Sequence, residues 1–221
     1  MNARCIDLGR MGYVAAWDVQ KRIAEDVEIG GDDTLLFVEH DPVLTLGASH
    51  KESNLLLSTD EYASLGIEVV KTDRGGDVTY HGPNQLVVYP IFNLRKHGKD
   101  LHKWMRGLEE AVIQAIDYLG VKGARSSVNT GVWVDEKKIA AIGIKVRRWV
   151  SLHGIALNCD NDLSRFDVIV PCGISTHGVT SLSEACGREV TIDEAKPLIA
   201  KAFESVFDLS FEHVQLREVL A

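Results

Sequence analysis

The segment from Arg74 to Gln85 is the richest in residues that could bind a substrate. It reads Arg-Gly-Gly-Asp-Val-Thr-Tyr-His-Gly-Pro-Asn-Gln. Adjacent glycines let backbone N–H groups approach a ligand closely, and such amides bind carbonyl oxygens or phosphates. Arg74 adds a fixed charge and His81 a titratable ring. The plain alternative is a turn between strands with solvated polar residues. The spacing matches neither a phosphate loop nor a G-x-G-x-x-G dinucleotide turn, which weakens nucleotide chemistry.

A second candidate is Lys138 at the start of the apolar run Lys-Ile-Ala-Ala-Ile-Gly. If its stem follows the strand inward, partial desolvation lowers the pKa of the amine and makes it a usable base. Ala141 and Gly143, two small alternating residues, leave room for a ligand chain beside the strand. The alternative is an ordinary lysine in a turn.

Cys172 in Val-Pro-Cys-Gly-Ile is the third candidate, as a nucleophilic thiol. Pro171 stiffens the approach to it and Gly173 clears space for a substrate carbonyl. The alternative is a buried cysteine that packs as a small hydrophobic residue. The other cysteines have less suitable surroundings: Cys5, Cys159 and Cys186.

Three histidines outside the glycine-rich segment are weaker candidates. His177 follows Cys172 by five residues and could pair with the thiol as a Cys-His dyad requires. His153 is expected near the site or, alternatively, as a hydrogen-bonded strand residue. His50 is expected in a loop. From the residues alone, Lys138, Lys145 and His177 all stay open as partners of the thiol.

The surrounding elements that must position these residues favour an α+β fold over a doubly wound sheet. Helical spacing predicts helices over 11–28 and 100–119, the second capped by Asp100, and a capping box at 191–194 predicts a helix to about 207. Strands are expected at 67–70, 86–91 and 149–157. Hairpins are expected over 35–46, around His40-Asp41-Pro42, and over 131–144, around a turn at 135–138.

The composition indicates one globular domain over residues 1–221. No apolar run approaches the roughly 20 residues of a membrane span, and residues 1–10 lack the apolar core of a secretory signal. No C-x-x-C pair occurs, which argues against structural zinc and a disulfide framework. We expect a cytoplasmic protein. The net charge of −8 disfavours nucleic-acid binding.

The residues from Arg74 to Ile91 resemble the signature of the lipoyl(octanoyl) transferases, the octanoyl-[acyl carrier protein]–protein N-octanoyltransferases of lipoate biosynthesis. Residues 138–143, 152–158 and 170–174 resemble the other blocks of that family, in the same order. The resemblance covers about residues 10–210.

The resemblance implies a single mixed-sheet α+β domain with flanking helices, like the catalytic domains of biotin and lipoate ligases, with no cofactor and no metal. It implies that Cys172 accepts the acyl group as a thioester and that Lys138 is its partner in a Cys/Lys dyad. It also implies an acyl pocket, lined by Arg74, Gly75, Gly76, Asp77, Val78, Thr79, Tyr80, His81, Ala141, Ile142, Gly143, Gly154, Ile155 and Ala156.

The implied partners are octanoyl-acyl carrier protein as donor and, as acceptors, the lipoyl domains of 2-oxoacid dehydrogenases and the glycine cleavage H protein. Neither nucleic acid nor membrane is implied, and a monomer is expected. Two residues depart from the family pattern: Asn84 replaces a usual glycine and Lys145 a common arginine. Asn tolerates left-handed backbone geometry, so we expect the turn at Asn84 to form. An ATP-dependent lipoate–protein ligase and a non-catalytic carrier-protein binding module are the alternatives.

Overall fold

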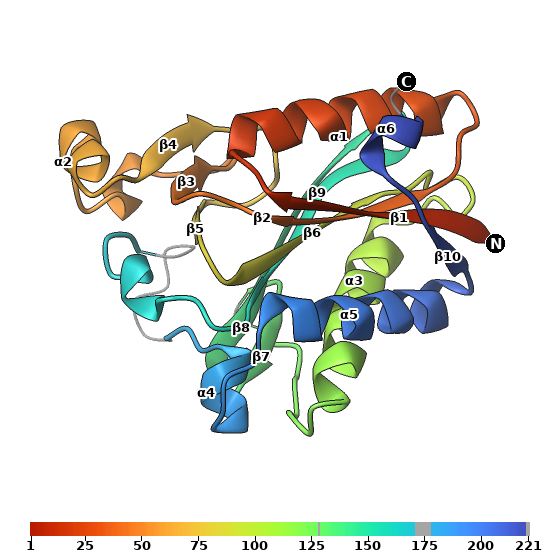
Figure 1. The fold of residues 1–221 in the computed structure, drawn as a ribbon. Coiled ribbons are helices and arrows are strands. Elements are labelled where there is room, and N and C mark those ends of the chain that lie inside the picture. Colours follow the sequence, from red (N-terminus) through yellow and green to blue (C-terminus); the bar gives the residue numbers. More distant parts are fainter. Residues whose placement is uncertain (128, 171–177, 220–221) are drawn as a thin grey trace.

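A seven-stranded mixed sheet forms the centre of the molecule, in the order β10-β1-β2-β6-β9-β8-β7 (Figure 1). The computed structural model describes residues 1–127, 129–170 and 178–219. The strands described are β1 (Asn2–Arg10), β2 (Thr34–Glu39), β3 (Val43–Leu46), β4 (Glu68–Lys71), β5 (Val78–His81), β6 (Gln85–Ile91), β7 (Val132–Val134), β8 (Lys137–Arg147), β9 (Val150–Asn158) and β10 (Ser210–His213). The helices described are α1 (Tyr13–Glu28), α2 (Thr59–Ser64), α3 (Leu101–Asp117), α4 (Leu182–Cys186), α5 (Ile192–Phe207) and α6 (Leu216–Val219), with 3₁₀ turns at Glu52–Asn54 and Leu163–Phe166.

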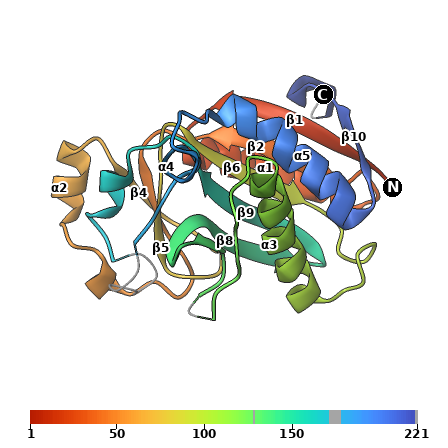
Figure 2. The same cartoon turned by 90° about the horizontal axis from the view of Figure 1, so that it is seen from below.

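Helices cover both faces of this sheet. Helix α1 lies along one face, where Ala16, Ile23 and Val27 pack against β2 and β6. Helices α3 and α5 cover the other face, as Figure 2 shows from below. Only the pairs β1–β10 and β1–β2 are parallel, and the other neighbours in this sheet run antiparallel. The predicted α+β class with a mixed sheet and flanking helices is therefore confirmed.

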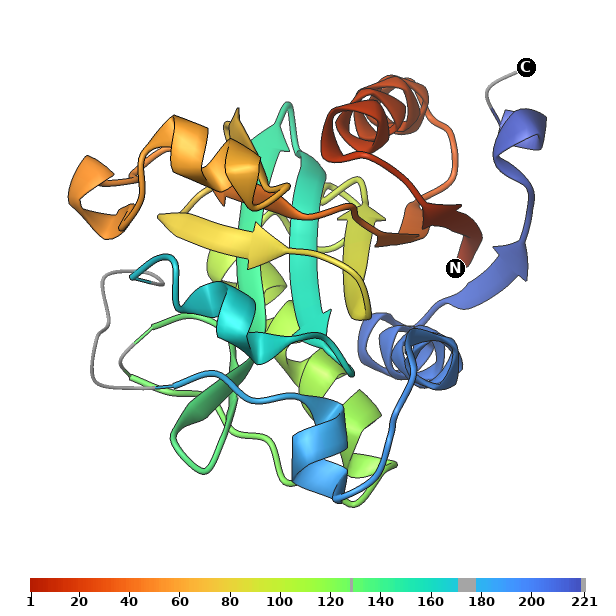
Figure 3. The ribbon, with the colours of Figure 1, turned by 60° about the vertical axis from the view of Figure 1, so that its left-hand side comes forward.

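A second, three-stranded sheet in the order β4-β3-β5 lies at one end of the large sheet. In Figure 3, β5 crosses β8 and β9. The crossing is a real contact, because the Gly75 N–H, just ahead of β5, donates to the Ile144 carbonyl of β8 at 2.8 Å. The small sheet thus places the glycine-rich segment directly over the strands that carry the other predicted site residues.

The predicted hairpin over 35–46 is wrong, because its two strands belong to different sheets. Both edges of β2 are already taken, by β1 and β6, so β3 pairs with β4 and β5 instead. His40 does not occupy an exposed turn: it is fully buried, with Nδ1 on the Met11 carbonyl at 2.8 Å and Nε2 on the Tyr89 hydroxyl at 2.7 Å. Its two contacts tie the segment between β2 and β3 to Met11 and to Tyr89 of β6.

Most of the other predicted elements are present. Asp100 caps α3 by accepting the backbone N–H groups of residues 102 and 103, as expected. Thr191 caps α5, but the expected capping box is incomplete, since the Glu194 carboxylate pairs with Arg188. The β7–β8 turn is shorter than predicted, with Asp135 and Glu136 at φ 46° and 64°, so that residues 137 and 138 belong to the strand. The Asn84 prediction is confirmed, at φ 62°.

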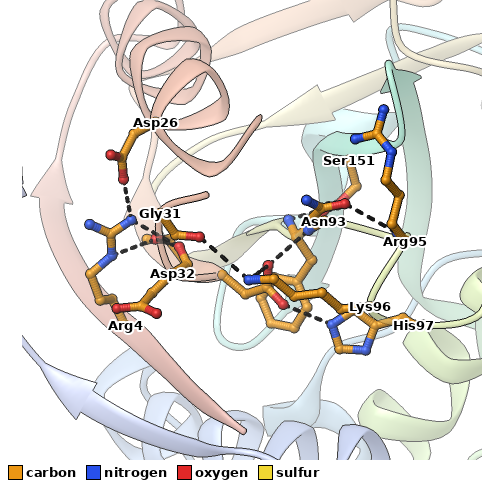
Figure 4. Close-up of polar contacts among 12 residues, drawn as sticks. Arg4, Asp26, Gly31, Asp32, Asn93, Arg95, Lys96, His97 and Ser151 are labelled. Carbon is orange, nitrogen blue, oxygen red and sulfur yellow. Dashed lines mark hydrogen bonds and ion pairs between the residues drawn. The ribbon is translucent and has the colours of Figure 1, made fainter. Parts of the chain in front are cut away.

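A polar cluster joins the start of β2 to the loop before α3 (Figure 4). The buried Asp33 carboxylate accepts the Asn93 N–H at 2.8 Å and His97 Nε2 at 2.8 Å, and Lys96 Nζ lies 3.6 Å from it. Beside it, Arg4 pairs with a carboxylate of α1. These contacts fix the far end of the sheet, away from the glycine-rich segment. In the described ranges, no helix has the length and apolar character needed to cross a membrane.

Candidate active site

A cavity of about 450 Å³ opens where the small sheet meets β8 and β9. It brings together Lys138 and all the predicted pocket residues except Val78 and Tyr80. Its lining comprises Tyr13, Ser49, Lys51, Arg74, Gly75, Gly76, Asp77, Thr79, His81, Val87, Tyr89, Met105, Asn129, Thr130, Lys138, Ala141, Ile142, Gly143, Ile144, His153, Gly154, Ile155 and Ala156.

Val78 and Tyr80 lie elsewhere because of the alternation of β5. Successive side chains of a strand point to opposite faces. Thr79 and His81 therefore line the cavity, whereas Val78 and Tyr80 are buried in the core of the small sheet, together with Phe166. The structure does not bring these two residues to the cavity.

Four small residues on β8 and β9 form one wall. Ala141 pairs with Ala156 and Gly143 pairs with Gly154 across the antiparallel ladder, so the four lie side by side. A Cβ on Gly143 would stand 2.9 Å from the Gly75 carbonyl oxygen, and one on Gly154 would collide with the Val88 carbonyl. Only glycine permits these two close approaches, which bring three segments of backbone together around the cavity.

A β-bulge places Lys138 on this wall. Val132 pairs with Ala140 and Trp133 with Lys138, so one extra residue, Ile139, stands in β8. Ile139 and Ala140 both enter the core under α3. Without the bulge, Lys138 would share a face with Ala140 instead of lining the cavity with Ala141 and Gly143. Bulges commonly redirect a side chain next to an active site.

The Lys138 ammonium has two described contacts. Nζ donates to the Thr130 carbonyl at 3.2 Å and lies 4.9 Å from the centre of the Trp133 ring. The main chain of Lys138 is held as well, since its N–H donates to the Gly178 carbonyl and its own carbonyl accepts the Thr180 N–H, both at 3.0 Å. The residue is half-buried and its contact with the Thr130 carbonyl is exposed, so the expected desolvation of the amine stays a prediction.

Arg74 and Asp77 act within the scaffold of the cavity. Arg74 is buried and donates to the Thr45 carbonyl and hydroxyl and to the Gly75 carbonyl. The Asp77 carboxylate accepts the Lys51 N–H at 3.1 Å and the Asn54 side-chain amide at 2.5 Å. Both residues line the cavity while holding the loops around it.

A buried network of rings closes the end of the cavity near α1. His153 Nε2 contacts Asp73 at 2.8 Å, so its Nδ1 accepts the Tyr13 hydroxyl at 3.2 Å. The Tyr13 ring stacks on the His81 ring, with centres 5.9 Å apart. His81 Nδ1 in turn contacts the side-chain amide oxygen Oε1 of Gln85 at 2.8 Å. His153 has φ 57° within a strand, a conformation that non-glycine residues rarely adopt and that clusters at functional sites.

The His40 ring adjoins this network, with its centre 5.8 Å from that of His81, and burial favours the neutral form of all three histidines. Desolvation lowers the pKa of His40 to about 4. It lowers the pKa of His81 well below its ordinary value, with further lowering by His40 and Arg74. The pKa of His153 is also lowered by burial, although the Asp73 carboxylate opposes the shift. At neutral pH these rings therefore act as uncharged hydrogen-bonding groups.

Cys172 and His177 lie outside the residues that the structure describes, so their predicted roles stay predictions. The described residues nearest to them in sequence have firm contacts. The Val170 N–H donates to the Asn54 carbonyl at 2.9 Å, and Gly178 contacts Lys138. Cys5 and Cys159 are buried, and desolvation raises the pKa of each thiol to about 12, as expected of inert cysteines. Cys186 is partly exposed.

Sequence reasoning missed several residues of the cavity. Tyr13 fits the apolar face of its helix, and nothing in its spacing distinguishes it from a core residue. Met105 likewise reads as part of the apolar face of α3. Asn129 and Thr130 precede β7 in a loop without a motif. His153 was not missed: it was expected either near the site or as a hydrogen-bonded strand residue, and the structure shows it both lining the cavity and hydrogen-bonded.

Within the described part of the chain, no group of three or more His, Cys, Asp or Glu side chains is placed to hold a metal ion. Arg74, Asp77 and His153, three polar side chains of the cavity, are engaged in hydrogen bonds with other side chains or with the backbone. The candidate site is thus a partly apolar cavity with Lys138 on its small-residue wall and a neutral polar network at one end.

Solved structures of low sequence identity share this fold. A putative lipoate protein ligase from T. acidophilum, solved with bound lipoic acid, superposes with a TM-score of 0.83 at 19% identity, covering 100% of this chain and 93% of the other. A biotin protein ligase from Aquifex aeolicus superposes with a TM-score of 0.53 at 13% identity, covering 93% of this chain and 69% of the other. The predicted likeness to the ligase catalytic domains is confirmed at the level of the fold.

Comparison with known sequences shows the family of the chain as well as its fold. Residues 12–204 match the model of the lipoyl protein ligase A/B catalytic domain. An octanoyltransferase from Chloroflexus aggregans is 46% identical over 206 residues, which cover 91% of this chain and 93% of the relative. One from Pelobacter propionicus is 45% identical over 203 residues, covering 91% and 94%. The chain therefore belongs to the lipoyl protein ligase A/B catalytic-domain family and, within it, to the octanoyltransferases.

Proposed function

We propose that the chain transfers an octanoyl group from octanoyl-acyl carrier protein to a lysine of lipoyl domains, the first step of endogenous protein lipoylation. The acceptors would be the lipoyl domains of 2-oxoacid dehydrogenases and the glycine cleavage H protein. The observation that supports this most is one cavity that joins Lys138 to the small-residue wall of β8 and β9, in a chain 46% identical to an octanoyltransferase over 91% of its length.

The proposed reaction has two steps. The Cys172 thiolate attacks the donor thioester, a new thioester forms on Cys172, and the thiol of the carrier leaves with a proton. The amine of the acceptor lysine then attacks the Cys172 thioester, an amide forms and the Cys172 thiol is released. Lys138 helps to ionise the thiol in the first step and accepts the proton lost by the amine in the second. This scheme predicts ping-pong kinetics.

The octanoyl tail is proposed to lie along the small-residue wall, against Ile142, Ile155 and Val87. Each methylene group buried there contributes about 0.8 kcal/mol. A backbone N–H is proposed to stabilise the tetrahedral oxyanion. The Gly75 N–H is committed to the Ile144 carbonyl, so the neighbouring Gly76 N–H is the better candidate of the two.

Docking of the protein substrates is proposed to use exposed basic side chains, because acidic partners would be repelled by a chain of net charge −8. Lys145 and Arg147 are exposed at the end of β8, and Lys103 is exposed on α3. Arg148 and Arg106 are less suitable, since they pair with Glu28 and Glu109. We propose that the reaction takes place in the cytoplasm.

Intact mass spectrometry of a lipoyl-domain acceptor tests this function. Incubation with the chain and octanoyl-acyl carrier protein, without ATP, should add one octanoyl mass to the acceptor. Modification only when ATP and a free acid are supplied would identify a ligase instead. An unmodified acceptor with either donor, together with binding of the carrier protein, would identify a non-catalytic binding module.

A further inference from the structure

A buried carboxylate on α3 holds the loop that contacts Lys138. Glu109 lies one turn after Met105 and three residues before Val112, on the face of the helix that packs against the sheet. Its side chain is 4% exposed. A buried carboxylate in the apolar face of a helix is costly unless all its lone pairs are engaged, so its presence there requires an explanation.

Both carboxylate oxygens of Glu109 are engaged. Oε2 pairs with Arg106 at 2.7 Å and with Arg125 at 3.2 Å. Oε1 accepts the Gly131 N–H at 3.3 Å, in a buried position. Two arginines therefore fix the carboxylate, and the carboxylate fixes the backbone at Gly131.

Gly131 adjoins the residue that contacts the Lys138 ammonium. The Thr130 carbonyl, which accepts from Lys138 Nζ at 3.2 Å, belongs to the peptide group that carries the Gly131 N–H. That group therefore joins the Glu109 carboxylate on one side to the lysine ammonium on the other. Gly131 also lies beside the stem of the lysine, since a Cβ added to Gly131 would be 3.5 Å from Lys138 Cε.

We propose that Glu109 is a positioning residue: through the Thr130–Gly131 peptide group it sets where the Lys138 ammonium stands in the cavity. This inference rests on the proposed role of Lys138. Because small displacements of a catalytic group cost up to about 100-fold in rate, loss of this support should lower turnover without weakening donor binding.

The test is the pH dependence of Cys172 alkylation by iodoacetamide, followed by peptide mass spectrometry, in the full-length protein. The buried Cys5 and Cys159 serve as unreactive internal references. Four proteins are compared: wild type, Glu109→Met, Lys138→Ala and the double variant. The matched control is Glu110→Gln, since Glu110 also pairs with Arg125, at 2.7 Å, but is not bonded to Gly131 in the described contacts.

We expect Glu109→Met to shift the alkylation profile to higher pH and to lower kcat by about tenfold at unchanged KM for the donor. The shift should disappear in the Lys138→Ala background and should be absent in Glu110→Gln. Where Glu109→Met does not fold, Glu109→Gln replaces it, with an intermediate shift expected, because the amide oxygen can still accept the Gly131 N–H but no longer pairs with the arginines.

Three results overturn the inference, and they can be told apart. If the pH profile of Cys172 alkylation is shifted in Lys138→Ala but is that of wild type in the folded Glu109 variant, only the role of Glu109 is contradicted and the role of Lys138 stands. A wild-type profile in Lys138→Ala contradicts the proposed role of Lys138 and, with it, this inference. An equal shift from Glu109→Met in both backgrounds would show that Glu109 acts on the thiol by another route, and it also overturns the inference.

Discussion

The buried His40 ring makes the protein unstable in acid. In the folded state Nδ1 faces the Met11 carbonyl, which can only accept, so Nδ1 carries the proton and Nε2 accepts from the Tyr89 hydroxyl. A second proton requires the Tyr89 hydroxyl to turn away and places a charge where no water reaches it. This arrangement explains why burial lowers the pKa of His40 to about 4.

The loss of stability in acid follows from the difference between the pKa of His40 in the folded protein and in the unfolded chain. An unfolded histidine has a pKa of about 6.5, so between about pH 6.5 and 4 the unfolded chain binds the proton more tightly. The His40 contribution to stability is therefore complete above this window and is lost as the pH falls through it. At pH 5 the loss amounts to about 2 kcal/mol, and it approaches about 3.4 kcal/mol below pH 4.

Urea unfolding at pH 7.5 and pH 5 measures this loss. His40→Gln should be less stable than wild type at pH 7.5, because the fit between Met11 and Tyr89 is disturbed, but it should lose about 2 kcal/mol less between the two pH values. His102→Gln is the control for the loss of a histidine, since His102 is exposed on α3. An equal pH dependence in wild type and His40→Gln would refute the reasoning.

Substitutions at Gly143, Asp33 and Lys138 test three other parts of the structure. Gly143→Val should abolish octanoyl transfer while costing about 1–3 kcal/mol in urea unfolding, because its side chain meets the Gly75 carbonyl; wild-type turnover would contradict the packing described. Asp33→Ala should lower the free energy of unfolding by about 3 kcal/mol, because Asn93, His97 and Lys96 lose the carboxylate that they contact. Octanoyl transfer at 25 °C should be unchanged, and a loss of less than about 1 kcal/mol would show that water replaces the carboxylate. Lys138→Ala should lower the transfer rate about 100-fold, measured with saturating donor; a wild-type rate would exclude the dyad.

The helices and most strands follow from patterns that the sequence displays directly. The apolar face and the Asp100 cap of α3 are local features, and so is the turn at Asn84, which is left-handed as expected. Local patterns decide local structure because caps and side-chain periodicity act over a few residues. The sequence pattern also identified Ala141 and Gly143 as the small residues of β8 that line the cavity.

What the sequence did not predict depends on contacts between residues far apart in the chain. A strand, a short polar stretch and a second strand predict a hairpin, and only the occupancy of β2 by β1 and β6 excludes it. The bulge at Ile139, which turns Lys138 toward the cavity, depends on pairing with β7 across the turn. Glu109 reads as an ordinary helical glutamate, because its partner at Gly131 is defined only by the tertiary fold.

The central claim is that the octanoyl group passes through Cys172. Acid quenching of the enzyme within one turnover of octanoyl-acyl carrier protein, in the absence of acceptor, followed by peptide mass spectrometry, tests it most directly. We predict one octanoyl group on the peptide that contains Cys172, lost on treatment with hydroxylamine and absent from Cys172→Ser. An octanoyl group on Cys186 or Lys138, or full transfer activity in Cys172→Ser, would contradict the account.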